Sequence, residues 1–486
     1  MSRHSTNPWV VLVIICLAQF MVVLDATIVN VALPSIGDDL GLSQANLQWI
    51  VTAYTLVFAG FLLLGGRMGD RLGRKRLFLV GLVVFTAASF LNGIATTSGM
   101  LIGFRALQGF GAALISPAAL SIISTTFEEG KERARALAVW AAIAIGGSAA
   151  GLVLGGALTE YLSWRWIFFV NIPVGVFAFF AALRLVPESK DEHAHKGYDL
   201  AGAVTVTGGL MLLVYGLVHS AQHGWGSTVS IVSFVVAAAL IVAFVLIESR
   251  AAEPLVRLSI FRVRSLTTAN LAMFLAFSGM FAMFYFNTQY IQRALHFSPL
   301  QAGIAFLPFT AGIMVSAGLA SALAPRIGVR PVTAVGMVLT IIGLLLFSRA
   351  PVDGSYATDV LPGMILAALG MGAIFMPLTL VATTGLKNED QGLASGLFNT
   401  SQQVGGALGL AILTTVAVNH TSAAALADPY NEASVPSLVN GWQYAFVGGA
   451  VLVGLSLIVF VALLRKKDVA RIEEEARTDD QPVFAS

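Results

Sequence analysis

The chain has 486 residues, of which 57% are hydrophobic and only 11% are charged, and its mean hydropathy is +0.82. This composition excludes an ordinary soluble protein and indicates a polytopic α-helical membrane protein, because apolar stretches of about 20 residues recur along the whole chain. The formal net charge of +2 gives no indication of a nucleic-acid partner, and the single cysteine excludes disulfides.

Fourteen segments are apolar enough to span a membrane, so we expect an all-α protein. They lie near residues 9–32, 45–66, 77–95, 100–124, 135–158, 166–186, 199–219, 229–248, 266–291, 300–324, 332–348, 359–384, 392–417 and 442–464. An even number of spans places both termini on one side of the membrane. If the N-terminus is cytoplasmic, 24 of the 28 Lys and Arg residues fall in cytoplasmic segments, so the positive-inside rule predicts that both termini are cytoplasmic. The longest outer loop, 418–441, contains Asp428-Pro429 and Val435-Pro436 and is expected to be a cap of turns.

An internal repeat relates the two halves of the chain. The loop after the second span contains Arg71-Leu72-Gly73-Arg74, and the loop after the tenth contains Arg326-Ile327-Gly328-Val329-Arg330. The spans that follow each carry two glycines and a proline, namely Gly109, Gly111 and Pro117, and Gly370, Gly372 and Pro377. The repeat predicts a six-helix bundle in 1–190, an inserted helix pair in 191–255, a second six-helix bundle in 256–465 and a cytoplasmic tail in 466–486. Two repeated bundles are typical of transporters.

Asp25 lies inside the first span, where hydrocarbon is expected to surround it. A charge at membrane depth costs at least ~2.5 kcal/mol, so such a residue normally faces a cavity or a partner and has a function. Asp25 is therefore our candidate for a proton-coupling residue. Alternatively, Asp25 lies near the outer end of its helix and reaches interfacial water. The other acids near the spans, Glu160, Asp199, Glu248 and Asp359, all fall at span ends.

The fourth span contains Arg105 within Leu101-Ile102-Gly103-Phe104-Arg105-Ala106-Leu107-Gln108. A buried guanidinium stays protonated at any working pH, so it must be hydrated or paired, and it can lower the proton affinity of a nearby carboxylate. The alternative is that Arg105 extends to the outer interface.

The loop after the second span is the densest charge cluster in the chain. Its glycines allow a tight turn, and Asp70 can pair with an arginine or cap a neighbouring helix, so the loop can act as a latch between two conformations. The alternative is a basic loop that only sets topology. The residues assigned to this inner-loop motif are Gly66, Gly69, Asp70, Arg71, Gly73, Arg74 and Lys75.

Small residues dominate one face of the fifth span, where Gly147, Gly151 and Gly155 recur at every fourth position and Gly156 follows. Such a row forms a groove against which another helix packs closely. Simple helix packing, without a role in transport, explains the row equally well.

Several amides and aromatic residues in the spans need partners or a wet cavity, because hydrocarbon offers them no hydrogen bonds. They can line a large substrate pocket, or they can simply form hydrogen bonds between helices or face lipid. The candidate pocket residues are Asn30, Tyr54, Gln108, Asn270, Tyr285, Gln289, Asn399 and Gln403.

The sequence lacks a P-loop, a Cys/His metal-ligand spacing and a G-x-S-x-G motif. We therefore expect no enzyme activity, no cofactor and no metal site, and no ATP-driven pump unless another subunit supplies the nucleotide site.

These motifs, taken together and in order, resemble the major facilitator superfamily, and specifically its fourteen-helix drug:proton antiporter branch of the EmrB/QacA type. The resemblance rests on residues 24–34, 66–76, 101–113, 164–173 and 392–409 and covers essentially the whole chain. One departure is that Gly151 is followed by Leu152, where the exporter motif of the fifth helix usually has a proline.

The resemblance implies a secondary active transporter that exports hydrophobic, often cationic small molecules or antibiotics in exchange for protons. Asp25 and Arg105 would form the coupling region, and the inner-loop motif would form a gate. We expect a monomer in the lipid bilayer of the cell membrane, with a small-molecule substrate and protons as partners. The alternatives are a proton-coupled importer of a small organic nutrient and, from other classes, a membrane enzyme or a sensor that does not transport.

Overall fold

The computed structural model describes residues 7–127, 130–190, 199–251, 254–383, 386 and 388–464. These residues form helices joined by short connections, with no strand assigned among them. Fourteen helical segments of the described residues are long and apolar enough to cross a membrane, which confirms the expected number of spans. The candidate tail at 466–486 lies outside the described residues.

The chain separates into two compact units, residues 1–255 with 296–306 and residues 256–295 with 307–486. The division of the sequence into four parts stays a prediction, although α12, expected in the second bundle, packs against α6 in unit 1. The helices of unit 1 are α1 (Pro8–Leu40), α2 (Gln44–Leu47), α3 (Trp49–Leu72), α4 (Arg74–Gly93), α5 (Ser98–Thr126), α6 (Lys131–Tyr161), α7 (Trp166–Phe169), α8 (Asn171–Leu185), α9 (Leu200–His223), α10 (Thr228–Arg250) and α12 (Pro299–Ala305).

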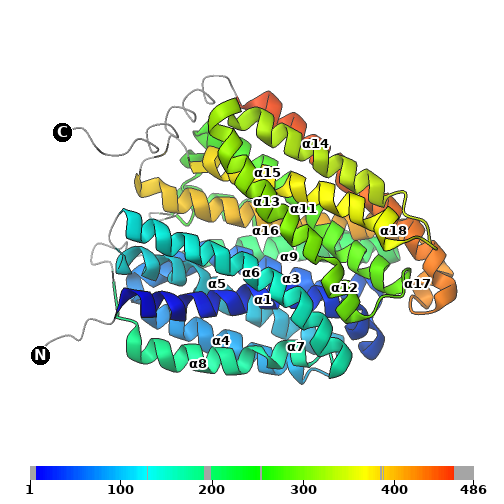
Figure 1. Cartoon of the computed structure of the whole chain (residues 1–486), viewed down its shortest axis with the longest axis horizontal. Coiled ribbons are helices and arrows are strands. Elements are labelled where there is room, and N and C mark those ends of the chain that lie inside the picture. The colour runs from blue at the N-terminus through cyan, green and yellow to red at the C-terminus, as the bar shows by residue number, and fades with distance from the viewer. Residues whose placement is uncertain are drawn as a thin grey trace, which may run out of the picture. The chain divides into compact units, whose positions relative to one another are not determined.

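Unit 2 contains the remaining helices, of which α11 and α13 to α18 are labelled in Figure 1. They are η1 (Leu258–Arg262), α11 (Arg264–Arg293), α13 (Leu307–Ile327), α14 (Val329–Phe347), η2 (Tyr356–Val360), α15 (Leu361–Thr383), α16 (Asn388–Asn419), α17 (Ala423–Ala427), η3 (Glu432–Ser434) and α18 (Val435–Leu463).

Two helix boundaries differ from the expected spans for identifiable reasons. The first helix runs through Pro34 and continues to Leu40. It ends at Gly41, which has a left-handed backbone (φ 58°) and whose N–H donates a hydrogen bond to the Gly37 carbonyl, so this glycine cap ends the helix where the proline does not. Pro436, expected in a turn, lies in the first turn of α18, where proline's missing N–H has no cost. The expected cap of turns thus contains α17, η3 and the start of α18.

The repeated glycines occupy equivalent structural positions in the two units. Gly73 (φ 108°) precedes α4 and Gly328 (φ 91°) precedes α14, each with a positive φ that glycine adopts without strain. A side chain at Gly109 or Gly111 would overlap α3 or α4 backbone, and one at Gly370 or Gly372 would overlap α14 or α13. These contacts support the internal repeat inferred from the sequence.

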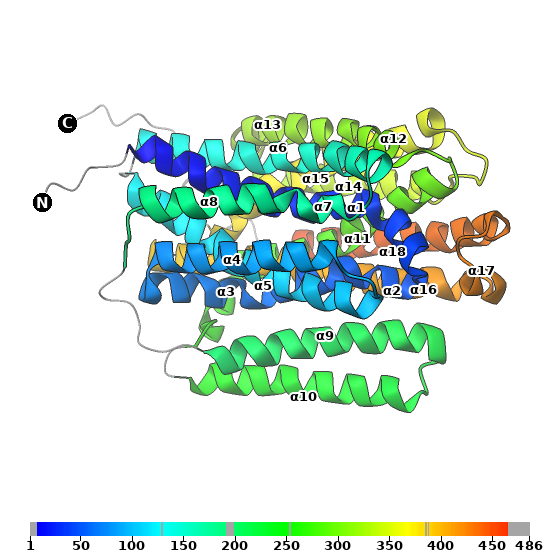
Figure 2. The same ribbon diagram turned by 90° about the horizontal axis from the view of Figure 1, so that it is seen from below.

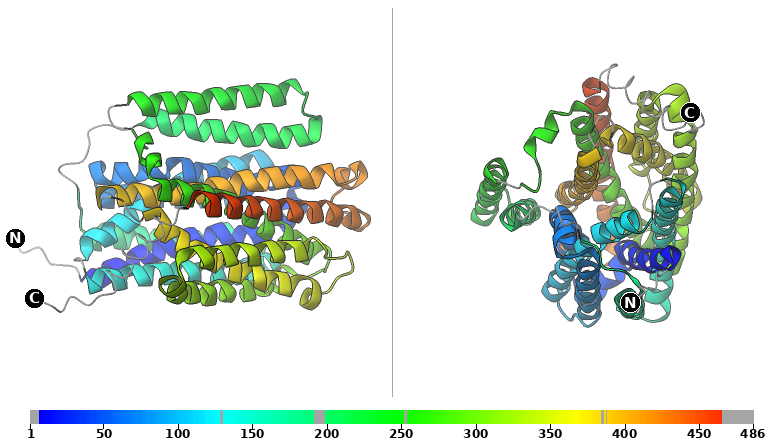
Figure 3. Two further views of the ribbon diagram at one scale, coloured as in Figure 1. Left: turned by 90° about the horizontal axis from the view of Figure 1, so that it is seen from above. Right: turned by 90° about the vertical axis from the view of Figure 1, so that its left-hand side faces the viewer.

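The helices α9 and α10 form an antiparallel hairpin, seen from below in Figure 2 and from two further directions in Figure 3. Within unit 1, α9 packs against α3, and a side chain at Gly60 of α3 would overlap Thr207 of α9. The missing side chain at Gly60 therefore lets the two helices approach closely. The start of the following segment is held by Arg67, whose guanidinium donates to the Pro254 carbonyl and, at 3.4 Å, to that of Leu255.

Candidate functional site

The two charged candidates from the spans form an ion pair in the interior of unit 1. Arg105 Nη1 of α5 lies 2.6 Å from Asp25 Oδ2 of α1, and the residues are 1% and 0% exposed. The geometry therefore disagrees with the alternative in which each side chain reaches interfacial water. A buried pair is stable only when its remaining polar atoms are also hydrogen-bonded.

Amide side chains satisfy the second carboxylate oxygen of Asp25. Its Oδ1 accepts from Gln108 Nε2 at 2.7 Å and from Asn171 Nδ2 at 2.8 Å. Gln108, which we expected in a substrate pocket, also accepts from Arg105 Nη1 at 2.8 Å through its Oε1. Gln108 is fully buried and therefore belongs to the ion-pair network rather than to an open pocket in this structure.

Two side chains of α4 complete this network. Asn92 Nδ2 donates to Gln108 Oε1 at 2.8 Å. Ser89 Oγ accepts from Asn171 at 3.0 Å and Gln108 at 3.2 Å, and donates to the Phe168 carbonyl at 2.8 Å. The network thus links α1, α4, α5 and α8, and we call Ser89, Asn92, Gln108 and Asn171 the amide shell of the pair.

The rest of the Arg105 guanidinium is satisfied by backbone and aromatic groups. Its Nε donates to the Ile50 carbonyl at 3.0 Å, and its Cζ lies 4.2 Å from the centroid of the Tyr54 ring. An arginine over an aromatic face is stabilised by the negative charge of that face. Tyr54, another candidate pocket residue, therefore supports the ion pair.

Close helix packing holds the ion pair in place. A side chain at Gly109, four residues after Arg105, would overlap the Tyr54 carbonyl, so α5 approaches α3 closely there. Gly151 of α6 leaves room for Leu24 and Thr27 of α1, which flank Asp25. Small residues at these crossings allow the backbones to meet and fix where the two charges lie.

The geometry permits one simple chemical event. Arginine cannot release its proton in a protein, so a proton that reaches this pair binds to the Asp25 carboxylate. The pair then changes from no net charge to +1, and the guanidinium loses its counter-charge. Because an unbalanced buried charge is costly, protonation favours a rearrangement that gives Arg105 a new partner or water.

The inner loop turns at Gly73 between α3 and α4, and Glu188, which the sequence analysis did not select, lies against it. Glu188 Oε1 accepts from the Lys75 amide at 3.1 Å, and Oε2 lies 3.7 Å from Arg76 Nε. Lys75 Nζ donates to the Leu183 carbonyl at 2.8 Å, and the Arg74 amide donates to the Ser189 carbonyl at 3.0 Å. The loop is thus tied to the segment that follows α8.

The remaining inner-loop candidates lie at the end of α3. Gly69 accepts the Gly73 amide through its carbonyl at 3.1 Å, and Gly66 faces Pro117 of α5. Arg71 lies in the last turn of α3, where a basic residue complements the helix dipole. The backbone of Asp70 belongs to α3, but its side chain lies outside the described residues, so the latch role stays a prediction.

The glycine row of α6 lies where this helix meets α1 and α12, and Figure 1 shows α6 beside α1. Gly147 lies against Phe20 and Gly155 against Ile28 of α1, whereas Gly156 lies against Pro299 and Leu300 of α12. At Leu152, where the resemblance predicts proline, α6 continues as a helix, and the Leu152 carbonyl is approached closely by Gly303 of α12.

The three candidate pocket residues of α11 divide into two groups. On α11, Asn270 Oδ1 accepts from Ser401 Oγ of α16 at 2.7 Å, so this amide links two helices. Tyr285 and Gln289 are buried one turn apart on the same helix and share a side-chain hydrogen bond.

Three other candidates are more accessible. Asn30 donates to the Ala26 carbonyl of its own helix at 3.1 Å and is half-buried. Asn399 is exposed and donates to Ser395 at 3.1 Å, and Gln403 is half-buried one turn further along α16. The role of the eight candidates in substrate binding stays a prediction.

Sequence reasoning missed three members of the amide shell and Glu188. A usable signal was present: Ser89 and Asn92 are polar residues three apart in an apolar span, and Asn171 interrupts the run Phe168-Phe169-Val170. Glu188 gave no such signal, because an acidic residue after a span is common. Among the described residues, no group of His, Cys, Asp and Glu has the arrangement of a metal site.

Comparison with curated proteins finds relatives along nearly the whole chain. The puromycin resistance protein pur8 of Streptomyces alboniger is 42% identical over 458 residues, which cover 93% of this chain and 90% of that protein. The cephamycin export protein CmcT of Amycolatopsis lactamdurans is 41% identical over 89% of this chain and 90% of its own length. The tetracenomycin C resistance and export protein of Streptomyces glaucescens is 34% identical, covering 88% of this chain and 79% of that one.

Solved transporter structures share the fold at low sequence identity. The nucleoside transporter NupG aligns with a TM-score of 0.67 and 13% identity over 94% of this chain and 100% of that one. A peptide transporter aligns with a TM-score of 0.67 and 15% identity over 95% of both chains. The model of the Major Facilitator Superfamily matches residues 15–410. The resemblance seen in the motifs is thereby confirmed, and the chain belongs to the Major Facilitator Superfamily.

Proposed function

We propose that this protein is a proton-coupled secondary active exporter of hydrophobic, often cationic small molecules, including antibiotics. The named functions of the relatives support export, since they include resistance to puromycin and export of cephamycin and tetracenomycin C. The protein would act as a monomer in the cell membrane. Its two termini would lie in the cytoplasm, since the distribution of lysine and arginine favours this orientation.

The observation that carries the proposal is the fully buried pair of Asp25 and Arg105 with its amide shell. A protein without a need for this charge would gain stability by replacing the pair with apolar residues, because desolvation often exceeds the attraction between the charges. Polar groups retained at membrane depth mark ion and proton pathways. Protonation of Asp25 is therefore the coupling event in this proposal.

The inner loop supplies a second conformational control. Its turn at Gly73 is held by Glu188 and by the segment after α8, so the ends of α3, α4 and α8 move together. Asp70, with the arginines of the loop, would stabilise one conformation and release it in the other. This latch role follows the residue pattern of the inner-loop motif.

The direct test measures drug movement in cells. Drug-sensitive bacteria that express the protein are loaded with puromycin or a fluorescent monovalent dye, and intracellular drug is followed when an energy source is added. We expect a fall in intracellular drug that a protonophore abolishes. The matched control is Asp25→Asn combined with Arg105→Gln, which removes both charges and should eliminate efflux.

The importer alternative predicts that intracellular solute rises, rather than falls, when an energy source is added. If energisation raises intracellular solute in cells with the wild-type protein and not in cells with the double variant, import replaces export as the function. Efflux that persists unchanged in a well-expressed double variant would remove the coupling role from this pair.

A further inference from the structure

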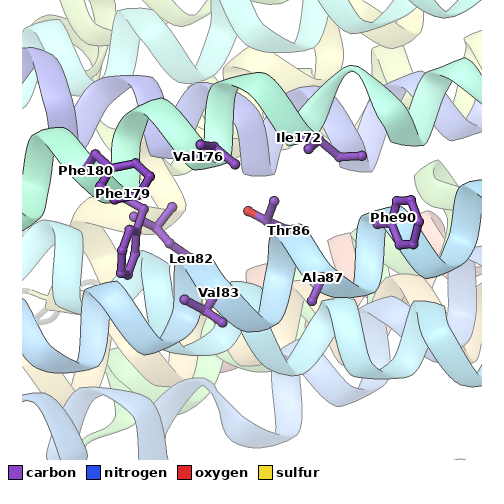
Figure 4. Close-up of a pocket in the computed structure, with 10 residues that line it drawn as sticks. Leu82, Val83, Thr86, Ala87, Phe90, Ile172, Val176, Phe179 and Phe180 are labelled. Atoms are coloured by element: carbon purple, nitrogen blue, oxygen red, sulfur yellow. The ribbon is translucent and has the colours of Figure 1, made fainter.

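An apolar groove runs along the outer surface of unit 1 between α4 and α8, shown in Figure 4. Its volume is about 360 Å³, and its walls come from the two helices alone. The lining includes Val83 and Phe90 of α4 and Val176 and Phe180 of α8, which are between 45% and 53% exposed. Such exposed apolar walls on a membrane helix pair face hydrocarbon rather than water.

The groove continues toward the beginning of α4. A second depression of about 450 Å³ shares Val83 and Phe179 with the first, and it ends at Arg76. Arg76 precedes Val80 by four residues, so it extends the same face of α4 that forms the wall. The two depressions therefore form one elongated groove with a basic residue at one end.

A second arginine lies at the same end of the groove. Arg184 follows Phe180 by four residues in the last turn of α8, and it is exposed. The side chain of Arg76 is 69% exposed, and Glu188 lies 3.7 Å from its Nε. Lys75 is also tied to this end of α8 through the Leu183 carbonyl, so among the described residues named here three basic groups lie near the one carboxylate of Glu188.

One polar atom interrupts the apolar walls. Figure 4 shows the Thr86 hydroxyl directed into the space between the two helices. Its Oγ1 is buried and has no hydrogen-bond partner in the structure, and Gly175 lies opposite, where any side chain would overlap it. Gly175 therefore covers this hydroxyl, and an occupant of the groove contacts the apolar walls at this level.

We propose that this groove is a site for an anionic diacyl phospholipid. One acyl chain lies between α4 and α8 along Val83, Phe179 and Phe180, and the phosphate lies at Arg76 and Arg184. Juxtamembrane arginines attract anionic head groups, and an arginine fork fits a phosphate in two places. The groove opens sideways on the exposed face of the helix pair, where lipid is the abundant amphiphile. This inference does not depend on the direction of transport.

Native mass spectrometry of the purified protein, with equimolar phosphatidylglycerol and phosphatidylethanolamine added, tests the proposal. We expect wild-type protein to retain phosphatidylglycerol preferentially, by about fivefold for each arginine involved. The variant Arg76→Gln/Arg184→Gln should lose most of this preference. Its control, Arg135→Gln/Arg262→Gln, removes the same charge from exposed positions elsewhere and should keep the preference.

A groove-filling variant tests the apolar part separately. Ala87→Phe places a ring in the groove wall, whereas Ala239→Phe places one on the exposed face of α10 as the matched control. We expect Ala87→Phe to retain one lipid fewer than both wild type and Ala239→Phe. Equal retention of the two lipids by wild type, an unchanged preference in the double arginine variant, or an unchanged lipid number in Ala87→Phe would each overturn the proposal.

Discussion

Arg105 Nη1 and Asp25 Oδ2 lie 2.6 Å apart in the interior of unit 1, so each charged group has the other as its partner. This relationship changes what a substitution at Asp25 does to the fold. Considered alone, a buried carboxylate is a cost whose removal should be tolerated. As a member of a pair, its removal leaves a buried guanidinium without a counter-charge.

We therefore expect Asp25→Asn to lower stability as well as to abolish proton-driven transport. Breaking a buried pair by removing one partner typically costs about 3–5 kcal/mol. The double variant Asp25→Asn/Arg105→Gln should recover much of the stability while remaining inactive. Thermal unfolding in detergent, together with dye efflux, measures both effects. If Asp25→Asn is as stable as wild type, the pair does not stabilise the fold, and near-normal efflux would exclude coupling at Asp25.

The amide shell predicts a graded effect on stability. Asn171 donates to the Asp25 carboxylate at 2.8 Å, whereas Asn92 donates only to the neutral Gln108 amide. A hydrogen bond to a charged group contributes about 1.5–3 kcal/mol, and one between neutral groups about 0.5–1.5 kcal/mol. Asn171→Ala should therefore lower the unfolding free energy more than Asn92→Ala. Denaturation of the two purified variants checks this order, and the reverse order would contradict our account of the network.

The glycine row predicts a contrast within one helix. A side chain at Gly151 would overlap Thr27 Oγ1, but one at Gly146 would meet no atom within 4 Å. Gly151→Ala should lower stability by about 1–3 kcal/mol through overpacking, while Gly146→Ala should be neutral. Melting temperatures of both variants provide the measurement. Equal melting temperatures would show that α6 can move away from α1 at little cost.

The latch role of the inner loop predicts a kinetic effect. Asp70→Asn should slow turnover more than it weakens drug binding, because the residue lies at the end of α3. Equilibrium drug binding to solubilised protein and initial transport rates in proteoliposomes separate these two quantities. A large loss of affinity with normal turnover would argue for a direct role in substrate binding instead.

The charge balance of unit 1 predicts an electroneutral exchange of drug for proton. Glu160 and Glu248 lie in the last turns of α6 and α10, and Asp199 caps α9, so Asp25 remains the interior carboxylate that we identify among the described spans. Exchange of one proton for one monovalent drug moves no net charge. Transport should follow the pH gradient and barely respond to membrane potential.

Proteoliposomes with a clamped potassium diffusion potential and no pH gradient provide the measurement. Substantial dye uptake driven by the potential would show that a second ionisable group takes part. The acids at the helix ends would then be the residues to substitute first.

The fold was predictable from sequence because hydrocarbon imposes strong rules on length and composition. Spans, their number and the internal repeat follow from apolar runs and from glycines such as Gly73 and Gly328. The pairing of Asp25 with Arg105 was only implied by the family resemblance. The two residues are 80 positions apart in the sequence, and no local pattern sets the distance between their side chains. Asn171 was missed because a lone amide in an apolar run has many possible partners. Pocket residues such as Asn399 stayed undetermined, because spacing on one helix does not say which helix faces it.

The hairpin of α9 and α10 has a consequence for how such a chain can grow. A pair of antiparallel helices returns the polypeptide to the side of the membrane from which it left, so its insertion leaves the sidedness of every later segment unchanged. The pair meets α3 through Thr207 and Gly60, and Arg67 holds the segment that follows it by the Pro254 carbonyl. An ancestral gene with twelve spans can therefore acquire two more in a single insertion, without any re-orientation of its second half.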